Sequence, residues 1–181
     1  MAINEQQRAE IIKIYKQGAD IKTLFLFEQI PAKKLQNVIR SYAPSMSADE
    51  IAILLHDDTV WGSSKEGFLL TNTHLYSKGM LEKGYHTKIS EINNITITHE
   101  KTSSTILVNA DIVTFKIQVL LPNKNDKTII FRVLDEMVKF LQGSPLRKAE
   151  NSQAKPLQCK GCGATTDGRF VTCEYCGVPL V

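Results

Sequence analysis

The chain has 181 residues, a formal net charge of +3 and 43% hydrophobic residues, which is the usage of an ordinary globular protein. This length allows one domain of medium size plus a small appendage. We expect a cytoplasmic protein without a secretory leader or a transmembrane segment, because polar residues crowd positions 1–15 and no apolar run reaches the roughly 18 residues that span a bilayer.

The first 46 residues are predicted to form a helical N-terminal segment. Helices are expected over residues 4–17, over residues 21–28 and from Pro31 to Pro44, since proline is well tolerated at the start of a helix. The apolar residues at helical spacing in the first and third helices are Ile11, Ile12, Tyr15, Leu35, Val38 and Ile39. We expect this segment to pack on the domain that follows or on another copy of the chain. The alternative is a DNA-reading helix-turn-helix, although acidic residues offset most of its positive charge.

Residues 47–142 change from helical spacing to the alternation that is typical of β-strands. Ser47-x-x-Glu50 has the capping-box pattern and is expected to open one helical turn before a strand that begins near Ile51. Asn72-Thr73 separates two apolar runs and fits a tight hairpin turn. The further strands expected are residues 68–71, 74–77, 85–89, 92–98, 105–108 and 112–121. Short strands at this spacing favour a small antiparallel sandwich or barrel.

A final helix is expected from Asp126, a good N-cap, to Gln142, with Gly143 as its terminator. Its apolar face consists of Ile130, Val133, Leu134, Met137, Val138 and Leu141. Residues 143–157 are polar and contain two prolines, so they are predicted to be a flexible linker.

The last segment, residues 158–181, contains all four cysteines of the chain. They form two Cys-x-x-Cys motifs separated by ten residues. Four thiolates at this spacing can bind one Zn²⁺ tetrahedrally and leave no open coordination position. We therefore predict a structural zinc ribbon, which folds only with its metal. The predicted ligands are Cys159, Cys162, Cys173 and Cys176.

Three other interpretations of these cysteines remain. Disulfides would allow three connectivities, but a cytosolic setting argues against them. Thiol redox chemistry normally places the motif at the head of a helix in a βαβ unit, which this sequence does not indicate. An iron–sulfur centre is not excluded by spacing alone.

The central region carries a resemblance to a known family. The residues concerned are the run from Glu50 to Thr59, then Gly62, the stretch Lys65-Glu66-Gly67-Phe68-Leu69-Leu70-Thr71, and Leu75-Tyr76. Residues 47–142 resemble the bacterial pleckstrin-homology-like domains of the GRAM and YokE type, which also occur joined to a zinc ribbon. The resemblance implies an antiparallel β-barrel closed by a C-terminal helix, and a docking role for peptides, proteins or lipid headgroups.

Several polar residues suggest chemistry, and each has a simpler structural interpretation. His56-Asp57-Asp58 is expected to end a strand with carboxylates that accept local turn hydrogen bonds. Ser63-Ser64-Lys65 is expected to be a polar hairpin loop, because no oxyanion-hole signature accompanies it. His74, His86 and His99 are scattered and have no metal-ligand spacing. Trp61, the sole tryptophan, is expected to pack inside the barrel.

The function expected from these features is that of a non-enzymatic interaction protein with a protein partner. The sequence therefore predicts an α+β chain with N-terminal helices (1–46), a pleckstrin-homology-like domain (47–142), a linker (143–157) and a zinc ribbon (158–181). Lipid headgroups fit poorly, because glutamates interleave with the candidate lysines Lys65, Lys78, Lys83 and Lys88. The alternative function is a nucleic-acid-associated zinc-ribbon protein, and a hydrolase ranks third because no paired catalytic groups are evident.

Overall fold

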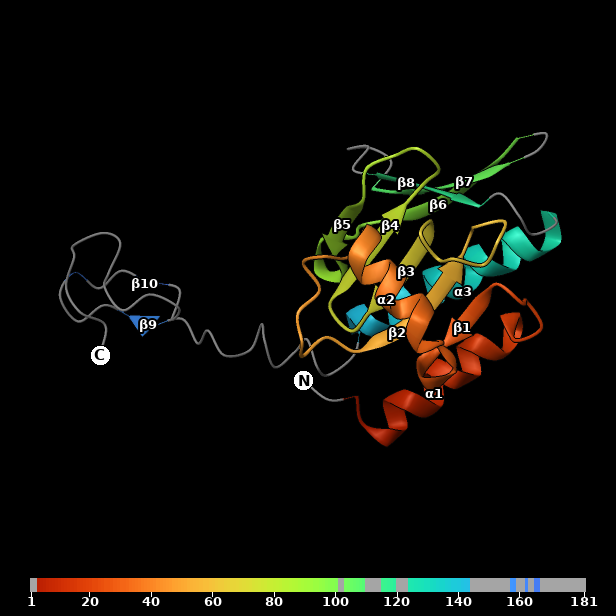
Figure 1. Ribbon diagram of the computed structural model, residues 1–181. Coiled ribbons are helices and arrows are strands. Elements are labelled where there is room, and N and C mark those ends of the chain that lie inside the picture. The colour runs from red at the N-terminus through yellow and green to blue at the C-terminus, as the bar shows by residue number, and fades with distance from the viewer. Residues whose placement is uncertain are drawn as a thin grey trace. The chain divides into compact units, whose positions relative to one another are not determined.

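The computed structural model describes residues 3–100, 103–109, 115–119, 124–143, 157–158, 162 and 165–166. The chain divides into two compact units, Met1–Gln142 and Gly143–Val181. The first unit is an α+β structure with a five-stranded and a three-stranded antiparallel sheet (Figure 1).

The N-terminal helix α1 (Glu5–Tyr15) begins with a reciprocal cap. The Asn4 side chain accepts a hydrogen bond from the Gln7 backbone, and the Gln7 side chain accepts one from the Asn4 backbone. The helix continues into a short 3₁₀ turn (Lys16–Gly18). The prediction of a helix is confirmed, although one of its three apolar positions, Ile12, is 38% exposed.

The prediction of a helix over residues 21–28 is wrong. This segment forms strand β1 (Leu24–Leu26) followed by a 3₁₀ turn (Phe27–Gln29). The strand pairs antiparallel with β2 (Ala52–Asp57), from Leu24 opposite His56 to Leu26 opposite Leu54. Pairing with the edge of β2 therefore decides that this segment is a strand. A short apolar run alone does not distinguish a helix from a strand.

Helix α2 (Ala32–Ser41) follows Pro31 as predicted, but it ends before Pro44. The Ser47–Glu50 pattern does not open a helix. The Ser47 backbone N–H donates to the Glu50 side chain (3.1 Å), so half of the capping box stabilises a turn that leads into β2.

The five-stranded sheet has the order β1-β2-β3-β4-β5, so every strand pairs with its neighbour in the sequence. The predicted hairpin at Asn72-Thr73 is confirmed, with Leu70 opposite Leu75. The strands after β2 are β3 (Gly67–Thr71), β4 (His74–Lys78) and β5 (Tyr85–Lys88). A short 3₁₀ turn (Ile89–Glu91) then leads to the second sheet.

The three-stranded sheet has the order β6-β7-β8. Its strands are β6 (Ile95–His99), β7 (Ser104–Val108) and β8 (Phe115–Val119). Each lies within or close to a predicted strand. The last strand, β8, lies beside β3 and β4, so the two sheets enclose a common interior.

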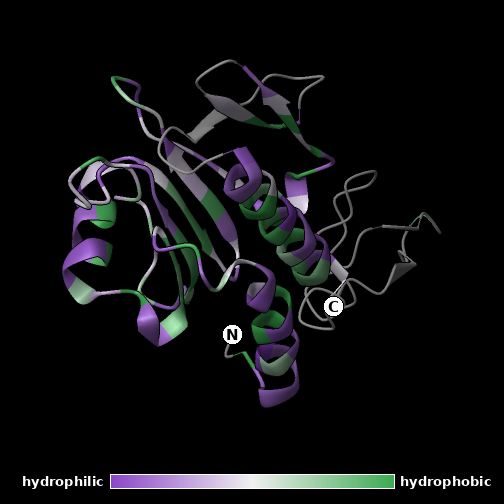
Figure 2. Ribbon diagram, turned by 90° about the vertical axis from the view of Figure 1, so that its right-hand side faces the viewer, coloured by the Kyte–Doolittle hydropathy of each residue, from purple (hydrophilic) through white to green (hydrophobic). Residues whose placement is uncertain are grey.

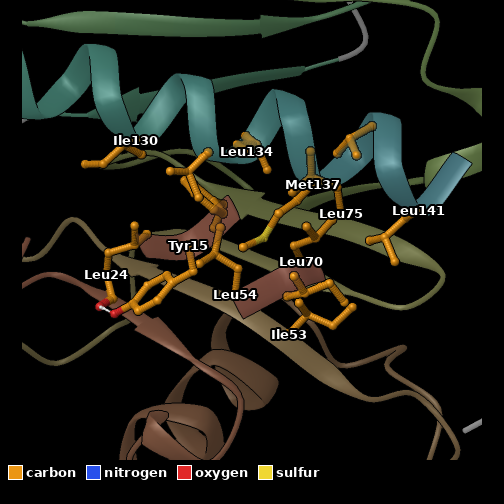
Figure 3. Packing of buried hydrophobic residues seen from close by; sticks show 14 of the residues in the cluster. Tyr15, Leu24, Ile53, Leu54, Leu70, Leu75, Ile130, Leu134, Met137 and Leu141 are labelled. Carbon is orange, nitrogen blue, oxygen red and sulfur yellow. Dashed lines mark hydrogen bonds between the residues drawn. The ribbon is translucent and has the colours of Figure 1, made fainter. Parts of the chain in front are cut away.

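Helix α3 (Lys124–Gly143) starts two residues before the predicted N-cap Asp126. Hydrophobic and hydrophilic residues alternate around its turns (Figure 2). All six residues of its predicted apolar face are buried, and they pack on β-strand residues such as Leu54, Leu70 and Leu75 (Figure 3). We call the side of the five-stranded sheet that meets this helix the α3 face.

The opposite side of the sheet, which we call the α2 face, carries a smaller core. Val38 and Tyr42 from the end of α2 pack there on Leu55, Leu69 and Tyr76. Strand β3 is therefore buried on both sides: Leu69 belongs to the α2 face and Leu70 to the α3 face. This explains why β3 reads as a continuous apolar run and not as an alternating one.

The second unit contains two short paired strands, β9 (Leu157–Gln158) and β10 (Thr165–Thr166). Most of the predicted linker and ribbon lies outside the described residues. Among the residues that are described, no helix has both the length and the apolar character needed to cross a membrane.

Candidate functional site

Two loops lie at the same end of the five-stranded sheet. The β2–β3 loop (residues 58–66) leaves β2 after Asp57, and the β4–β5 loop (residues 79–84) leaves β4 after Lys78. Gly67 of β3 pairs with both of these residues. The two loops must therefore emerge side by side, and we call this edge the loop end of the sheet.

A buried carboxylate organises the β2–β3 loop. The Asp57 side chain is 2% exposed. One of its oxygens accepts hydrogen bonds from the backbone N–H groups of Thr59 (3.1 Å) and Ser64 (3.1 Å), and from the Thr59 hydroxyl. Its other oxygen forms an ion pair with the ammonium group of Lys34. The loop therefore folds around the negative charge of Asp57, which Lys34 neutralises.

Helix α2 ties both loops to the sheet. Asn37 donates to the carbonyl of Ser63 (2.8 Å), and Ser41 donates to the carbonyl of Lys65 (2.9 Å). The Ser41 hydroxyl also accepts a hydrogen bond from the Lys78 ammonium at the end of β4 (3.1 Å). At the base of the β4–β5 loop, a Cβ on Gly84 would lie 2.8 Å from the Tyr42 Cα, so only glycine allows this approach.

Large apolar side chains project from both loops. Val60 is 73% exposed and Trp61 is 93% exposed in the β2–β3 loop, while Met80 is 52% exposed and Leu81 is 98% exposed in the β4–β5 loop. The expectation that Trp61 packs inside the barrel is therefore wrong. It lies in a connection outside the strands, beyond the reach of the core.

Leu81 has a positive φ of 61°, a left-handed conformation that costs a residue with a Cβ about 1 kcal/mol or more. Its side chain gains no burial in return. Leu81 therefore destabilises the folded chain in two ways, through its strained backbone and through the exposure of an apolar side chain to water.

Asp57 lies at the end of β2 and accepts hydrogen bonds from the following turn, as predicted. Burial raises the pKa of Asp57, but the hydrogen bonds from Lys34, Thr59 and Ser64 outweigh it and the pKa is lowered. His56 points to the α3 face, stacks on Phe68 at 5.4 Å between ring centroids, and is fully buried. Burial lowers the pKa of His56 to about 4.

The Ser63-Ser64-Lys65 segment is a polar loop, as predicted. The Ser64 side chain is buried and its hydroxyl has no hydrogen-bond partner in the part of the chain that the structure describes. The lysine that pairs with the Asp57 carboxylate is Lys34 of α2, and not Lys65, which follows Ser64 in the sequence. Among the described residues, no hydrogen bond joins the buried Ser64 hydroxyl to a lysine.

A second polar cluster lies on the α2 face, near the opposite end of β4. Glu50, with a side chain 5% exposed, accepts hydrogen bonds from Thr71 (2.6 Å) and Tyr76 (2.9 Å). The His74 ring lies 3.4 Å from the Glu50 carboxylate and 6.0 Å, centroid to centroid, from the ring of His86. The view that these two histidines are scattered is therefore wrong.

This cluster does not form a metal site in the arrangement observed. No group of three histidine, cysteine or acidic side chains stands ready to hold a metal ion among the described residues. Both oxygens of Glu50 already accept hydrogen bonds from hydroxyl groups. Its role is to close the sheet at the point where the turn over Ser47–Glu50 enters β2.

Of the four predicted zinc ligands, Cys162 is described, and its side chain is exposed. Cys159, Cys173 and Cys176 lie outside the described residues, so the zinc site remains a prediction. The paired strands β9 and β10 lie on either side of residues 159–164, with Gln158 opposite Thr165.

The residues that sequence reasoning missed at the loop end are Lys34, Asn37 and Ser41. They lie 23 to 37 positions before the groups that they contact. Their spacing on helix α2 is a helical i, i+3, i+7 pattern, which placed them on one face but did not indicate what that face meets.

Comparisons with protein-family models, with curated proteins and with solved structures give no significant match for this chain.

Proposed function

We propose that this chain is a non-enzymatic interaction protein, in which a pleckstrin-homology-like domain docks a protein partner and a zinc ribbon supplies a second contact surface. One observation carries the proposal. The four neighbouring strands β2 to β5 are followed by the three strands β6 to β8 and then by α3, which buries its apolar face in the shared interior. Antiparallel strands followed by a C-terminal helix that covers their interior agree with what the resemblance to pleckstrin-homology-like domains implies.

The carboxylates of the domain support docking in preference to catalysis. The carboxylate of Asp57 is satisfied by Lys34 and by the loop that it organises, and that of Glu50 by hydroxyl groups on β3 and β4. Groups held in this way hold the structure in place, whereas a catalytic carboxylate needs a free oxygen directed at a substrate.

The docking surface that we favour is the outer edge of β5. This strand is the last in its sheet, and Tyr85, His86 and Lys88 are exposed on it. An edge strand offers unpaired backbone groups to which an extended peptide can add as a further strand.

The zinc ribbon is proposed from the two cysteine motifs, the first of which lies in sequence between the paired strands β9 and β10. Zinc would supply the folding free energy of this small unit, on the order of 10–16 kcal/mol in comparable peptides. A closed four-thiolate site supplies no reactive position.

Elemental analysis of the reduced, freshly purified protein tests the metal. We expect one equivalent of zinc, which Cys162→Ser abolishes while the Met1–Gln142 unit stays folded. Protein that contains no metal, or iron and inorganic sulfide in its place, would contradict the zinc ribbon without affecting the docking proposal.

Affinity capture followed by hydrogen exchange tests the docking function. The intact chain and a chain truncated after Gly143 are compared as baits, and the captured complex is then analysed for amide protection. We expect a protein partner that slows exchange in β5. Capture of nucleic acid with affinity that falls steeply as salt rises would favour the nucleic-acid alternative.

A further inference from the structure

The loop end carries an apolar patch that the fold does not use. We define the loop-tip patch as Val60 and Trp61 of the β2–β3 loop with Met80 and Leu81 of the β4–β5 loop. These four side chains are between 52% and 98% exposed. The next most exposed large apolar residues among those described, Tyr85, Ile12 and Ile39, are between 37% and 40% exposed. Two adjacent loops thus present the most exposed apolar side chains in the described part of the chain.

Hydrogen bonds and backbone conformation keep the loop-tip patch away from the core. The Asp57 carboxylate fixes the backbone on both sides of Trp61, through Thr59 and Ser64, and Lys34 donates to the carbonyl of Gly62. Leu81 keeps a bulky side chain in a left-handed conformation that glycine would adopt without strain. A loop whose backbone is already ordered loses less conformational freedom on binding, which favours its use as an interface anchor.

The charges around the patch indicate what covers it. Lys65 and Glu66 are neighbours in one loop, and Glu82 and Lys83 are neighbours in the other. None of the four forms an ion pair with another residue that the structure describes. This collar has no net charge, so it attracts neither an anionic membrane nor a nucleic acid. It does carry both signs on one surface, so two identical collars can complement each other across a twofold axis.

We propose that the loop-tip patch is a self-association surface through which two copies of this chain form a symmetric dimer. The apolar tips of the two copies cover one another, and the lysines of each collar face the glutamates of the other. An apolar centre within a charged rim is the usual anatomy of such a contact. The inference is independent of a partner at the β5 edge.

The sole tryptophan reports on this surface directly, because Trp61 belongs to the patch. Sedimentation velocity and tryptophan emission are measured on the intact protein over the same concentration series. We expect the mass to double and the emission to shift to shorter wavelength together, as Trp61 leaves water. Leu81→Ser keeps the reporter, and we expect it to weaken the dimer by about tenfold or more. The matched control is Ile12→Ser, which alters an exposed apolar residue on α1 and leaves the dimer unchanged.

A charge-swap experiment tests the collar. One variant carries Lys65→Glu with Lys83→Glu, and the other carries Glu66→Lys with Glu82→Lys. Each alone presents a collar of one sign to itself, so we expect both to be monomers. Mixed in equal amounts, they should form a heterodimer with the emission shift of the native dimer. All four positions are in surface loops, and circular dichroism checks that each variant is folded.

Three results would overturn the proposal. The first is a protein that stays monomeric, with water-like emission, at every concentration. The second is a dimer that Leu81→Ser leaves intact, since the contact would then lie elsewhere. The third is monomeric protein whose emission shifts only when vesicles of phosphatidylcholine and phosphatidylglycerol are added, since the patch would then be a membrane anchor.

Discussion

The two faces of the five-stranded sheet are stabilised in different ways. The α3 face is packed with apolar side chains from the strands, from α1, from α3 and from the three-stranded sheet. The α2 face has a smaller apolar core, and two buried carboxylates, Glu50 and Asp57, hold the segments around it by directed hydrogen bonds. Non-directional burial therefore supplies most of the stability, while the polar face positions the turns and loops.

This difference predicts how each face responds to change. Loss of volume should matter most on the α3 face, because close packing there leaves little room for relaxation. Loss of hydrogen bonds or of charge should matter most on the α2 face, where a carboxylate left without its donors would be buried at a cost. The two faces should also respond to acid over different pH ranges.

The largest effect is expected from Leu70→Ala on the α3 face. Leu70 is fully buried between β-strand neighbours and α3, so the substitution should lower the free energy of unfolding by about 3–5 kcal/mol. Urea denaturation measures the loss. Leu69→Ala, which removes the same atoms from the α2 face one residue earlier, should cost less because its surroundings are a smaller cluster. Equal losses at both positions would remove the distinction between the faces.

The second prediction concerns pH and the one histidine of the α3 face. Burial lowers the pKa of His56 from 6.5 to about 4, so the unfolded chain binds a proton that the folded chain does not bind between these values. Stability is therefore complete above pH 6.5 and falls as the pH drops towards 4, by about 3 kcal/mol in all. His56→Phe, which keeps a ring against Phe68, should abolish this slope.

The acid response of the α2 face should begin lower. Hydrogen bonds hold the pKa values of both Asp57 and Glu50 below their ordinary values of 3.8 and 4.5. Their contribution is present above those values and is lost as the pH falls through the lowered pKa. If His56→Phe left the slope between pH 6.5 and pH 4 unchanged, the assignment of that range to the α3 face would be wrong.

The elements that sequence alone predicts are those whose pattern is local and long. Helix α3 shows this, since its 3.6-residue period identified six core positions, from Ile130 to Leu141, and all are buried. Strand β1 shows the opposite. Its apolar run is too short to have a period, and its pairing partner β2 lies about 30 residues later in the chain.

The loop end divides in the same way. That Asp57 accepts hydrogen bonds from the following turn was predictable, because Thr59 and Ser64 are close to it in sequence. The ion pair between Lys34 and Asp57 was not predictable, because no local sequence pattern links two residues that are 23 positions apart. Trp61 was misplaced because aromatic character favours burial on average but does not say whether a residue lies in a strand or in a loop.

The third prediction tests whether the polar face positions the loops. Asp57→Asn removes the ion pair with Lys34 and weakens the acceptor for the Thr59 and Ser64 amides, so we expect a loss of about 2–3 kcal/mol. Lys34, with a side chain 20% exposed, can turn towards water, which limits the cost. Denaturation measures the loss, and limited proteolysis should show cleavage within residues 58–66.

A matched control for this substitution is Asp135→Asn. Asp135 pairs with Lys139 one turn along α3, where the lysine is 70% exposed, so the loss should be below about 0.5 kcal/mol. If Asp57→Asn cost no more than this surface pair, or left the β2–β3 loop resistant to protease, the carboxylate would not be what organises the loop.

The smallest effect separates packing from hydrogen bonding at a single residue of the α2 face. Tyr76 is 1% exposed, stacks on the His86 ring and donates to Glu50 at 2.9 Å. Tyr76→Phe keeps the ring and removes the donor, so we expect a loss of about 1 kcal/mol by urea denaturation. Because burial, together with the Glu50 carboxylate, raises the pKa of Tyr76, the phenol stays protonated and the loss should not vary between pH 6 and pH 9. Glu50→Gln combined with Tyr76→Phe should cost less than the two separate losses added together, since the first weakens the hydrogen bond that the second removes. Strictly additive losses would mean that the Tyr76 hydroxyl and the Glu50 carboxylate do not stabilise each other, and directed hydrogen bonding would then not distinguish the α2 face at this residue.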